Sequence, residues 1–181
     1  MDYKKRAKEL VETAEEGLTS SSSDVKKRRA VSSTYYALFH LLIGETAAKI
    51  NCPNEKLETS LRRSVGHGSV SAACSAFCEN ATVKKVGKIS EVIDPDELIN
   101  GNYQKILNLA KLLCRLKEQR EESDYALSDL KTEFYEIRKW IKQVETAVNN
   151  WETIKTSETA QVLLSLVVQK SMGGGRNGTE Q

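Results

Sequence analysis

The segment RRSVGHG, residues 62–68, places two arginines and a histidine close together in the sequence. Arg63 and His67 are four residues apart and share a helix face if the helical turn continues. A guanidinium grips and neutralises a phosphate oxygen, while an imidazole with an unperturbed pKa of about 6.5 moves protons at neutral pH. Gly66 and Gly68 leave room for a substrate beside the imidazole. This combination suits phosphodiester chemistry.

The same segment also has an interpretation that needs no substrate. It is then the end of a helix, in which His67 caps a carbonyl group while Arg62 and Arg63 are solvated. Taken alone, these residues favour this structural interpretation over the chemical one, so further motifs have to decide between the two.

An arginine–aspartate pair and a second histidine are further candidates for chemistry. Arg120 and Asp124 have the i, i+4 spacing of a helical ion pair, which at the surface of a helix end contributes under about 1 kcal/mol to stability. His40 stands between Phe39 and Leu41, and a histidine between apolar residues is more often a hydrogen-bonded core residue than a catalyst. We therefore expect His40 to serve packing.

The cysteines and the known short motifs give no metal or cofactor site. The four cysteines form no CxxC pair, and their spacing to the two histidines fits no zinc pattern; they are Cys52, Cys74, Cys78 and Cys114. The chain has no Walker loop, dinucleotide glycine fingerprint, GxSxG or His-Glu helix motif. We predict no metal, no cofactor and reduced thiols in a cytoplasmic protein.

The composition is that of an ordinary globular domain, with 39% hydrophobic and 29% charged residues. The formal net charge is only +2, so binding to a polyanion requires local clusters of basic residues. The longest apolar run, Val162 to Val168, is too short to cross a bilayer, and the N-terminal residues lack the apolar region of a signal peptide. We expect no contact with a membrane.

The longest periodic segment is Asp24 to Ile50, which we predict to be a helix in the middle of a bundle. Its apolar stripe consists of Val31, Tyr35, Leu38, Phe39, Leu42 and Thr46. Its first turns carry four consecutive cations, although the helix dipole disfavours each by about 0.3–1 kcal/mol. These are Lys26, Lys27, Arg28 and Arg29. We predict an RNA or anion site there; the equally open alternative is that Arg28 and Arg29 pair with acidic residues such as Glu121 and Glu122.

Helical periodicity recurs along most of the chain, and no segment shows sustained strand alternation. The predicted helices are Tyr3–Gly17, Asp24–Ile50, Glu55–Val65, Val70–Cys78, Asn102–Tyr125, Leu130–Trp151 and Ser157–Lys170, the last one capped by Ser157. Gly66-His67-Gly68 is expected to interrupt two of them, and residues 81–101 have only a weak pattern. The predicted fold is all-α, an up-and-down helical bundle with extra short helices.

We predict three parts of the chain. Residues 1–155 form the bundle, residues 156–171 a C-terminal helix packed on the bundle or at a dimer interface, and residues 172–181 a disordered tail. We expect a domain of this size to leave apolar residues exposed at an interface between two copies. The candidates are Val162, Leu163, Leu166 and Val167 on the last helix, with Ala72, Ala73 and Ala76.

Three motifs resemble those of one known family. RRAVSSTYYALFHLL, residues 28–42, is similar to the signature helix of small bacterial HEPN-domain proteins. RRSVGHG resembles the arginine-to-histidine motif of HEPN ribonucleases, although members of the family often have a polar or acidic residue where this chain has Gly66. REESDY, residues 120–125, resembles the family's Arg-x-x-Ala-Asp-Tyr signature, with Ser123 in place of alanine.

The resemblance implies a HEPN-like helical bundle that dimerises and cleaves RNA without a metal, in a cleft that both subunits share. His67 would be the general acid/base and Arg62 would bind the scissile phosphate, with Arg63 as the alternative. The signature positions Tyr35, Arg120, Asp124 and Tyr125 would support the site.

Such an enzyme would be a toxin or phage-defence effector, and its partner would be an antitoxin or another regulatory protein. The alternative from the same family is a non-catalytic HEPN module that binds a nucleotide, RNA or a partner protein. Whether an arginine and His67 meet in a cleft at a dimer interface distinguishes the two.

Overall fold

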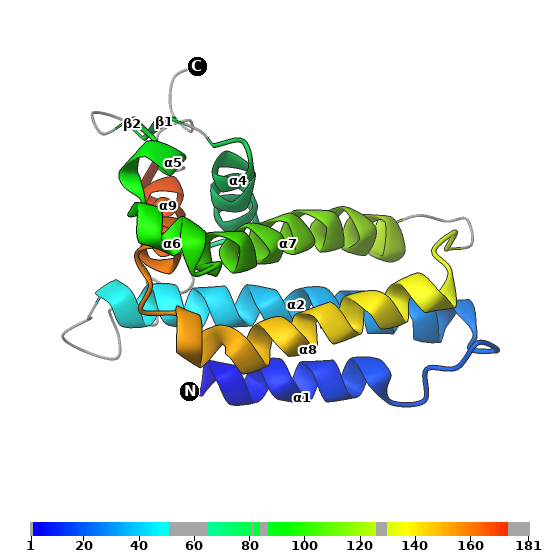
Figure 1. Cartoon of the computed structure of the whole chain (residues 1–181). Helices are drawn as coiled ribbons and strands as arrows, with labels where there is room; N and C mark the ends of the chain where they lie inside the picture. The colour runs from blue at the N-terminus through cyan, green and yellow to red at the C-terminus, as the bar shows by residue number, and fades with distance from the viewer. Residues whose placement is uncertain (1, 51–64, 81, 84–86, 126–129, 174–181) are drawn as a thin grey trace, which may run out of the picture. The chain divides into compact units, whose positions relative to one another are not determined.

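The computed structural model describes residues 2–50, 65–80, 82–83, 87–125 and 130–173. Its elements are α1 (Tyr3–Glu15), α2 (Asp24–Ile50), α4 (His67–Cys78), β1 (Thr82–Val83), β2 (Gly87–Lys88), α5 (Ile89–Val92), α6 (Pro95–Ile99), α7 (Asn102–Tyr125), α8 (Phe134–Ile154) and α9 (Glu158–Gly173), as Figure 1 shows. The two short strands pair antiparallel, Thr82 opposite Lys88 and Val83 opposite Gly87. The chain is all-α helical, which confirms the predicted fold class. Among the helices described, none is both long and apolar enough to cross a membrane.

The chain forms two compact units, each built from separate stretches of sequence. The first unit contains residues 1–41 and 112–151, and the second contains residues 42–111 and 152–181. The helices α2, α7 and α8 therefore each begin in one unit and end in the other. The boundary expected after residue 155 stays a prediction.

The first unit is held together by the apolar faces of α1, α8 and the parts of α2 and α7 that belong to it. Asp2 starts α1 by accepting a hydrogen bond from the Lys5 amide at 2.9 Å. α1 and α8 run side by side (Figure 1). Each carries a stripe of buried apolar residues. The buried residues of these two helices are Ala7, Val11, Ala14, Phe134, Ile137, Trp140, Ile141, Val144, Val148 and Trp151. Each large aliphatic or aromatic side chain buried here contributes about 1.5–3 kcal/mol.

The second unit centres on the packing of α4 against α9. Ser157 caps α9 by accepting a hydrogen bond from the Ala160 amide at 3.2 Å, which confirms the predicted cap. The Glu97 carboxylate of α6 accepts a hydrogen bond from the Thr159 hydroxyl at 2.8 Å and so ties α6 to the start of α9. The small residues of α4 let α9 approach closely, and Ala73, Cys74 and Leu163 are buried as a result.

This packing overturns the apolar argument for a dimer. Leu163, Leu166, Val167 and Ala73 are buried within a single chain, because α4 and α9 belong to the same unit and pack on each other. Of the remaining candidates, Val162 and Ala76 are half-buried and only Ala72 is exposed. Dimerisation therefore stays a prediction that rests on the family resemblance.

Several helix bounds differ from the prediction. α4 begins at His67 rather than Val70, so of the predicted interruption Gly66-His67-Gly68 only Gly66 lies outside the helix. α1 ends at Glu15, just before Gly17 adopts a left-handed φ of 68°, and α8 runs from Phe134 to Ile154. α9 continues to Gly173, so the first two residues of the expected tail are helical. The expected helix Glu55–Val65 lies, except for Val65, outside the described residues.

Candidate functional site

His67 is the first residue of α4, and its side chain is half-buried. Gly66 precedes it as the N-cap, with an extended backbone (φ −84°, ψ 170°) and no side-chain hydrogen bond to the helix. The Gly66 carbonyl accepts hydrogen bonds from the amides of Ser69 at 3.1 Å and Val70 at 3.2 Å, and this starts the helix. The glycine that was expected to break a helix therefore begins one.

The described part of the chain leaves space for side chains at this helix start. Apart from the neighbouring residues and the backbone of α4 itself, no described atom lies within 4 Å of a Cβ atom added at Gly66 or Gly68. The first turn of α4 contains no acidic residue, so nothing there offsets the partial positive charge that a helix N-terminus carries. An imidazole placed at such an end stands where backbone amides favour a phosphate or another anion.

Arg62 and Arg63, the predicted phosphate-binding residues, lie outside the described residues. Their distance from His67 therefore stays a prediction.

Arg120 and Asp124 form the predicted ion pair on α7, with 2.6 Å between Nε and Oδ2. The Arg120 side chain is only 16% exposed and that of Asp124 30%, so the pair is more buried than the surface bridge expected from the sequence. Opposite charges are thus in direct contact within one helix. Ser32 of α2 donates a hydrogen bond to the other carboxylate oxygen of Asp124 at 2.9 Å.

Three tyrosine rings surround the guanidinium of Arg120. Its central carbon lies 5.5 Å from the ring centroid of Tyr36, 5.9 Å from that of Tyr125 and 6.0 Å from that of Tyr35. These distances are those of cation–π contacts. Burial by itself lowers the pKa of Arg120, but Tyr36, Asp124 and Tyr125 together raise it above its ordinary value. The predicted supporting residues thus meet around the permanent positive charge of Arg120. Groups of the protein itself already contact this charge.

The start of α2 is joined to the end of α7 by Arg28. Its Nη1 donates a hydrogen bond to the Ser123 carbonyl at 2.6 Å, and its Nε pairs with Asp24 one turn earlier. The second carboxylate oxygen of Asp24 accepts a hydrogen bond from the Leu130 amide at 2.9 Å. The Arg28 contact, and after it the Leu130 amide, hold the pKa of Asp24 below its ordinary value.

The predicted basic cluster at the start of α2 is therefore divided. Arg28 is used inside the protein, and its acidic partner is Asp24, while Glu121 pairs with Lys117 at 2.7 Å. Lys26 and Arg29 are exposed and Lys27 is half-buried. Three of the four cations remain at the surface where an anion can reach them.

His40 differs from the expected core residue. It is half-buried, and its ring stacks on that of Tyr36 with 6.0 Å between the centroids. Both rings belong to a strip of α2 that is not fully buried. This strip consists of Val25, Arg29, Ser32, Ser33, Tyr36 and His40.

Sequence reasoning missed the roles of Ser32 and Tyr36 in this cluster. Their spacing from Arg29 and His40, three to four residues at each step, was the available signal, because it puts polar and aromatic side chains on one strip of an otherwise apolar helix.

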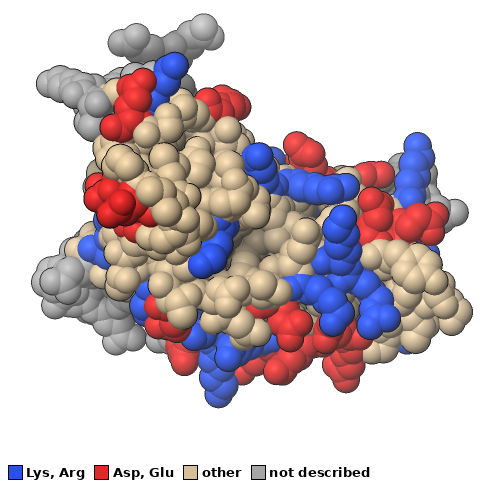
Figure 2. Space-filling model, viewed as in Figure 1, with Lys and Arg blue, Asp and Glu red and all other residues tan. Residues whose placement is uncertain are grey.

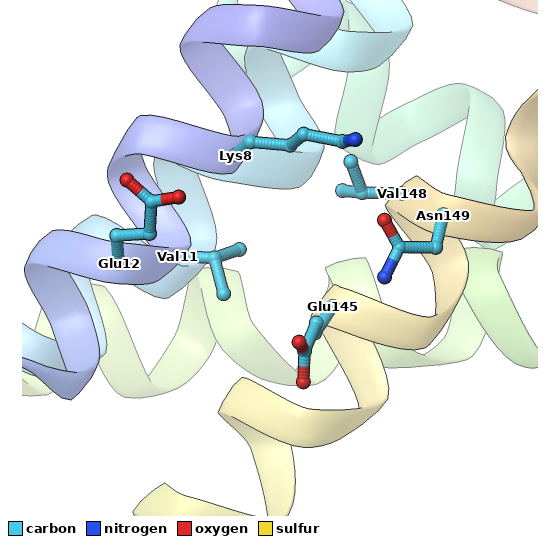
Figure 3. A pocket seen from close by; sticks show the side chains of 6 residues that line it. All are labelled: Lys8, Val11, Glu12, Glu145, Val148 and Asn149. Carbon is cyan, nitrogen blue, oxygen red and sulfur yellow. The ribbon is translucent and has the colours of Figure 1, made fainter.

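A small groove lies between α1 and α8, with a volume of about 200 Å³. Figure 3 shows its lining side chains, which are Lys8, Val11 and Glu12 from α1 and Glu145, Val148 and Asn149 from α8. The two valines are buried and form its floor, while the charged residues are exposed at its rim. None of the predicted site residues lines it. Within the described ranges, no group of three or more His, Cys, Asp or Glu side chains is arranged to hold a metal ion.

Comparison with known proteins gives no relative. The chain matches no model of a protein family, no curated protein and no solved structure. The function therefore has to be argued from the residues and their geometry.

Proposed function

We propose that this chain is a metal-independent endoribonuclease of the HEPN type, with His67 as its general acid/base. The observation that supports this most directly is the position of His67 as the first residue of α4, half-buried and flanked by two glycines that no described side chain crowds. A scissile phosphate placed at this helix N-terminus would meet both backbone amides and an imidazole.

The proposed reaction is an internal transfer at phosphorus. The 2′-oxygen of the RNA forms a bond to phosphorus and gives up its proton to a base, and the bond to the 5′-oxygen breaks as that oxygen gains a proton. His67 would serve one of these proton transfers. Arg62 or Arg63 would neutralise the phosphate oxygens with a two-pronged contact that lysine does not reproduce. The products would carry a 2′,3′-cyclic phosphate and a 5′-hydroxyl.

The alternative is a non-catalytic HEPN module that binds a nucleotide, RNA or a partner protein. One observation favours it: Gly66 offers no side chain next to His67, whereas an acidic or polar group there would help to orient the imidazole. The structure uses Arg28 and Arg120 for internal contacts in the first unit, which also suits a scaffold.

Cleavage of a single-stranded RNA oligonucleotide in EDTA distinguishes these two functions. We expect the wild-type protein to cleave it and His67→Ala to lose about 10²- to 10⁴-fold in rate. His40→Gln is the matched control, because it changes the other histidine of the chain and should leave the rate nearly unchanged. A 2′-deoxy group at the scissile nucleotide should block the reaction.

Circular dichroism should show that both variants keep the wild-type helix content. Cleavage that persists in His67→Ala, or that requires magnesium, would reject the proposed chemistry. An effector role as a toxin or in phage defence is tested separately, as growth arrest on expression that His67→Ala relieves.

A further inference from the structure

The outward side of α8 differs from an ordinary solvated helix face. Its buried side faces the core of the first unit through Ile137, Ile141 and Val144. The opposite side presents exposed residues on successive turns of the helix. These outward residues are Tyr135, Arg138, Lys139, Lys142 and Thr146, which we call the α8 ridge.

The α8 ridge contains three cations and no carboxylate. Arg138 and Lys142 are four residues apart and Lys139 and Lys142 are three apart, so like charges face one another along the helix, which is unfavourable in isolation. Within the described part of the chain, Lys139 and Lys142 have no ion pair and no hydrogen bond from their side chains. Figure 2 shows Lys and Arg side chains gathered over the first half of α8.

The nearest acidic side chains of α8 lie at the two edges of the ridge. Glu136 pairs with Arg115 of α7, with 3.6 Å between the charged atoms. Glu145 lines the groove that α8 forms with α1 (Figure 3). Within the described part of the chain, neither carboxylate forms an ion pair with a cation of the ridge.

An exposed aromatic ring stands at the start of the ridge. Tyr135 is 77% exposed, although burying a ring of this size is strongly favourable. The ring of Phe134 contacts the ring of Tyr135 edge to face, with 5.3 Å between the centroids. Arg138 lies over the Phe134 ring at 5.6 Å, so the first cation of the ridge is held next to Tyr135.

We propose that the α8 ridge binds single-stranded RNA, with a base stacked on Tyr135 and the following phosphates on Arg138, Lys139 and Lys142. A ring beside a row of cations is the combination that proteins use for single strands, because every unpaired base offers a face for stacking. A duplex has no free base face for Tyr135. This inference rests on the proposed function in one respect, namely that RNA is the substrate.

The binding test uses fluorescence anisotropy with a labelled 12-nucleotide RNA and the full-length protein. Lys139→Glu/Lys142→Glu should weaken binding at least 10-fold at low salt and reduce the slope of log K against log salt by about 1.4. Tyr135→Ala should weaken binding about 5- to 150-fold with little change in slope, and Tyr135→Phe should bind as the wild type does. The matched control is Lys105→Glu/Lys111→Glu, which makes the same charge change at two exposed lysines of α7.

Three results would overturn the ridge proposal. One is an equal loss of binding in the control variant, which would make net charge the cause. Another is equal competition by duplex RNA. The third is displacement of the RNA by an acidic peptide at an equal concentration of charges, which would point to a protein partner.

Cleavage kinetics distinguish the role of the ridge from the role of the active site. At saturating RNA the ridge variants should cleave at the wild-type rate with a raised KM, whereas His67→Ala should bind as tightly as the wild type. If no cleavage occurs but the ridge variants still lose binding, the ridge proposal stands and the proposed enzyme activity fails. If cleavage occurs and the ridge variants keep the wild-type KM, the ridge proposal fails alone.

Discussion

Arg28 of α2 donates a hydrogen bond to the backbone carbonyl of Ser123 in α7, 2.6 Å away and 95 residues later in the chain. The last carbonyls of a helix have no partner within it, so a cation that reaches one of them satisfies the group and also favours the negative end of the helix dipole. The same guanidinium pairs with Asp24, which in turn holds the Leu130 amide. One arginine therefore joins the start of α2 to the end of α7 and, through Asp24, to the segment before α8.

Replacement of Arg28 should lower stability where replacement of its neighbour does not. Arg28→Ala removes a charge-assisted hydrogen bond from a side chain that is only 18% exposed, and we expect the free energy of unfolding to fall by about 1.5–3 kcal/mol. Arg29→Ala is the matched control: Arg29 is exposed, and no ion pair or hydrogen bond of its side chain is found among the residues described. The free energy of unfolding of Arg29→Ala should differ from that of the wild type by no more than about 0.5 kcal/mol. Urea unfolding of the two variants measures the difference, and equal losses would contradict the role of Arg28.

The ion pair of Asp24 should make stability depend on pH in the acid range. Its pKa in the folded protein lies below the ordinary value of 3.8, so the unfolded chain takes up the proton first as the pH falls. The stabilising contribution is therefore complete above pH 3.8 and is lost as the pH falls through the folded pKa. Asp24→Asn should flatten this part of the curve of unfolding free energy against pH. An unchanged curve in the variant would show that other carboxylates cause the acid dependence.

The two strongest helices could be predicted from the sequence with their final bounds. α2 and α7 run from Asp24 to Ile50 and from Asn102 to Tyr125, as their long apolar periods indicated. α4 was predicted to begin too late because Gly66 and Gly68 were taken as breaks. The burial of Val70 and Phe77 outweighs the roughly 1 kcal/mol that a glycine costs inside a helix, and only the folded chain reveals this.

Some contacts of the candidate sites could likewise be predicted from the sequence, and others could not. The pairing of Arg120 with Asp124 followed from their i, i+4 spacing and is present. The hydrogen bond from Ser32 and the contact with Tyr36 come from α2, more than 80 residues earlier in the chain. The local spacing puts both residues on one strip of α2, but it does not tell which part of the chain this strip contacts. The ion pair of Arg28 was expected in kind but with the wrong acid, because Asp24 lies on the same helix face one turn away and is the nearer partner.

Ser123 and Ser32 should respond in opposite ways to the same substitution. The Ser123 side chain is 3% exposed, and its hydroxyl has no hydrogen-bond partner among the residues described. Ser123→Ala removes this unsatisfied group and should raise the free energy of unfolding by about 1 kcal/mol. Ser32→Ala instead removes the hydrogen bond to Asp124 and should lower it by about 0.5–1.5 kcal/mol. Because both residues lie inside long helices, the change in helix propensity is similar and cancels in the comparison. Thermal unfolding of both variants checks the signs.

A side chain at Gly66 should stabilise the helix that carries His67. The backbone there is extended with φ −84°, which every residue adopts easily, and a Cβ atom meets no side chain of the described residues within 4 Å. Gly66→Ser supplies the missing cap and reduces the freedom of the unfolded chain, so we expect a gain of about 0.5–1 kcal/mol. Gly17→Ser is the matched control with the opposite sign, because φ is 68° at Gly17 and a residue with a Cβ atom loses about 1–2 kcal/mol there. Hydrogen exchange at the α4 amides should slow in Gly66→Ser, and exchange that is unchanged or faster would mean that α4 does not begin at His67 in solution.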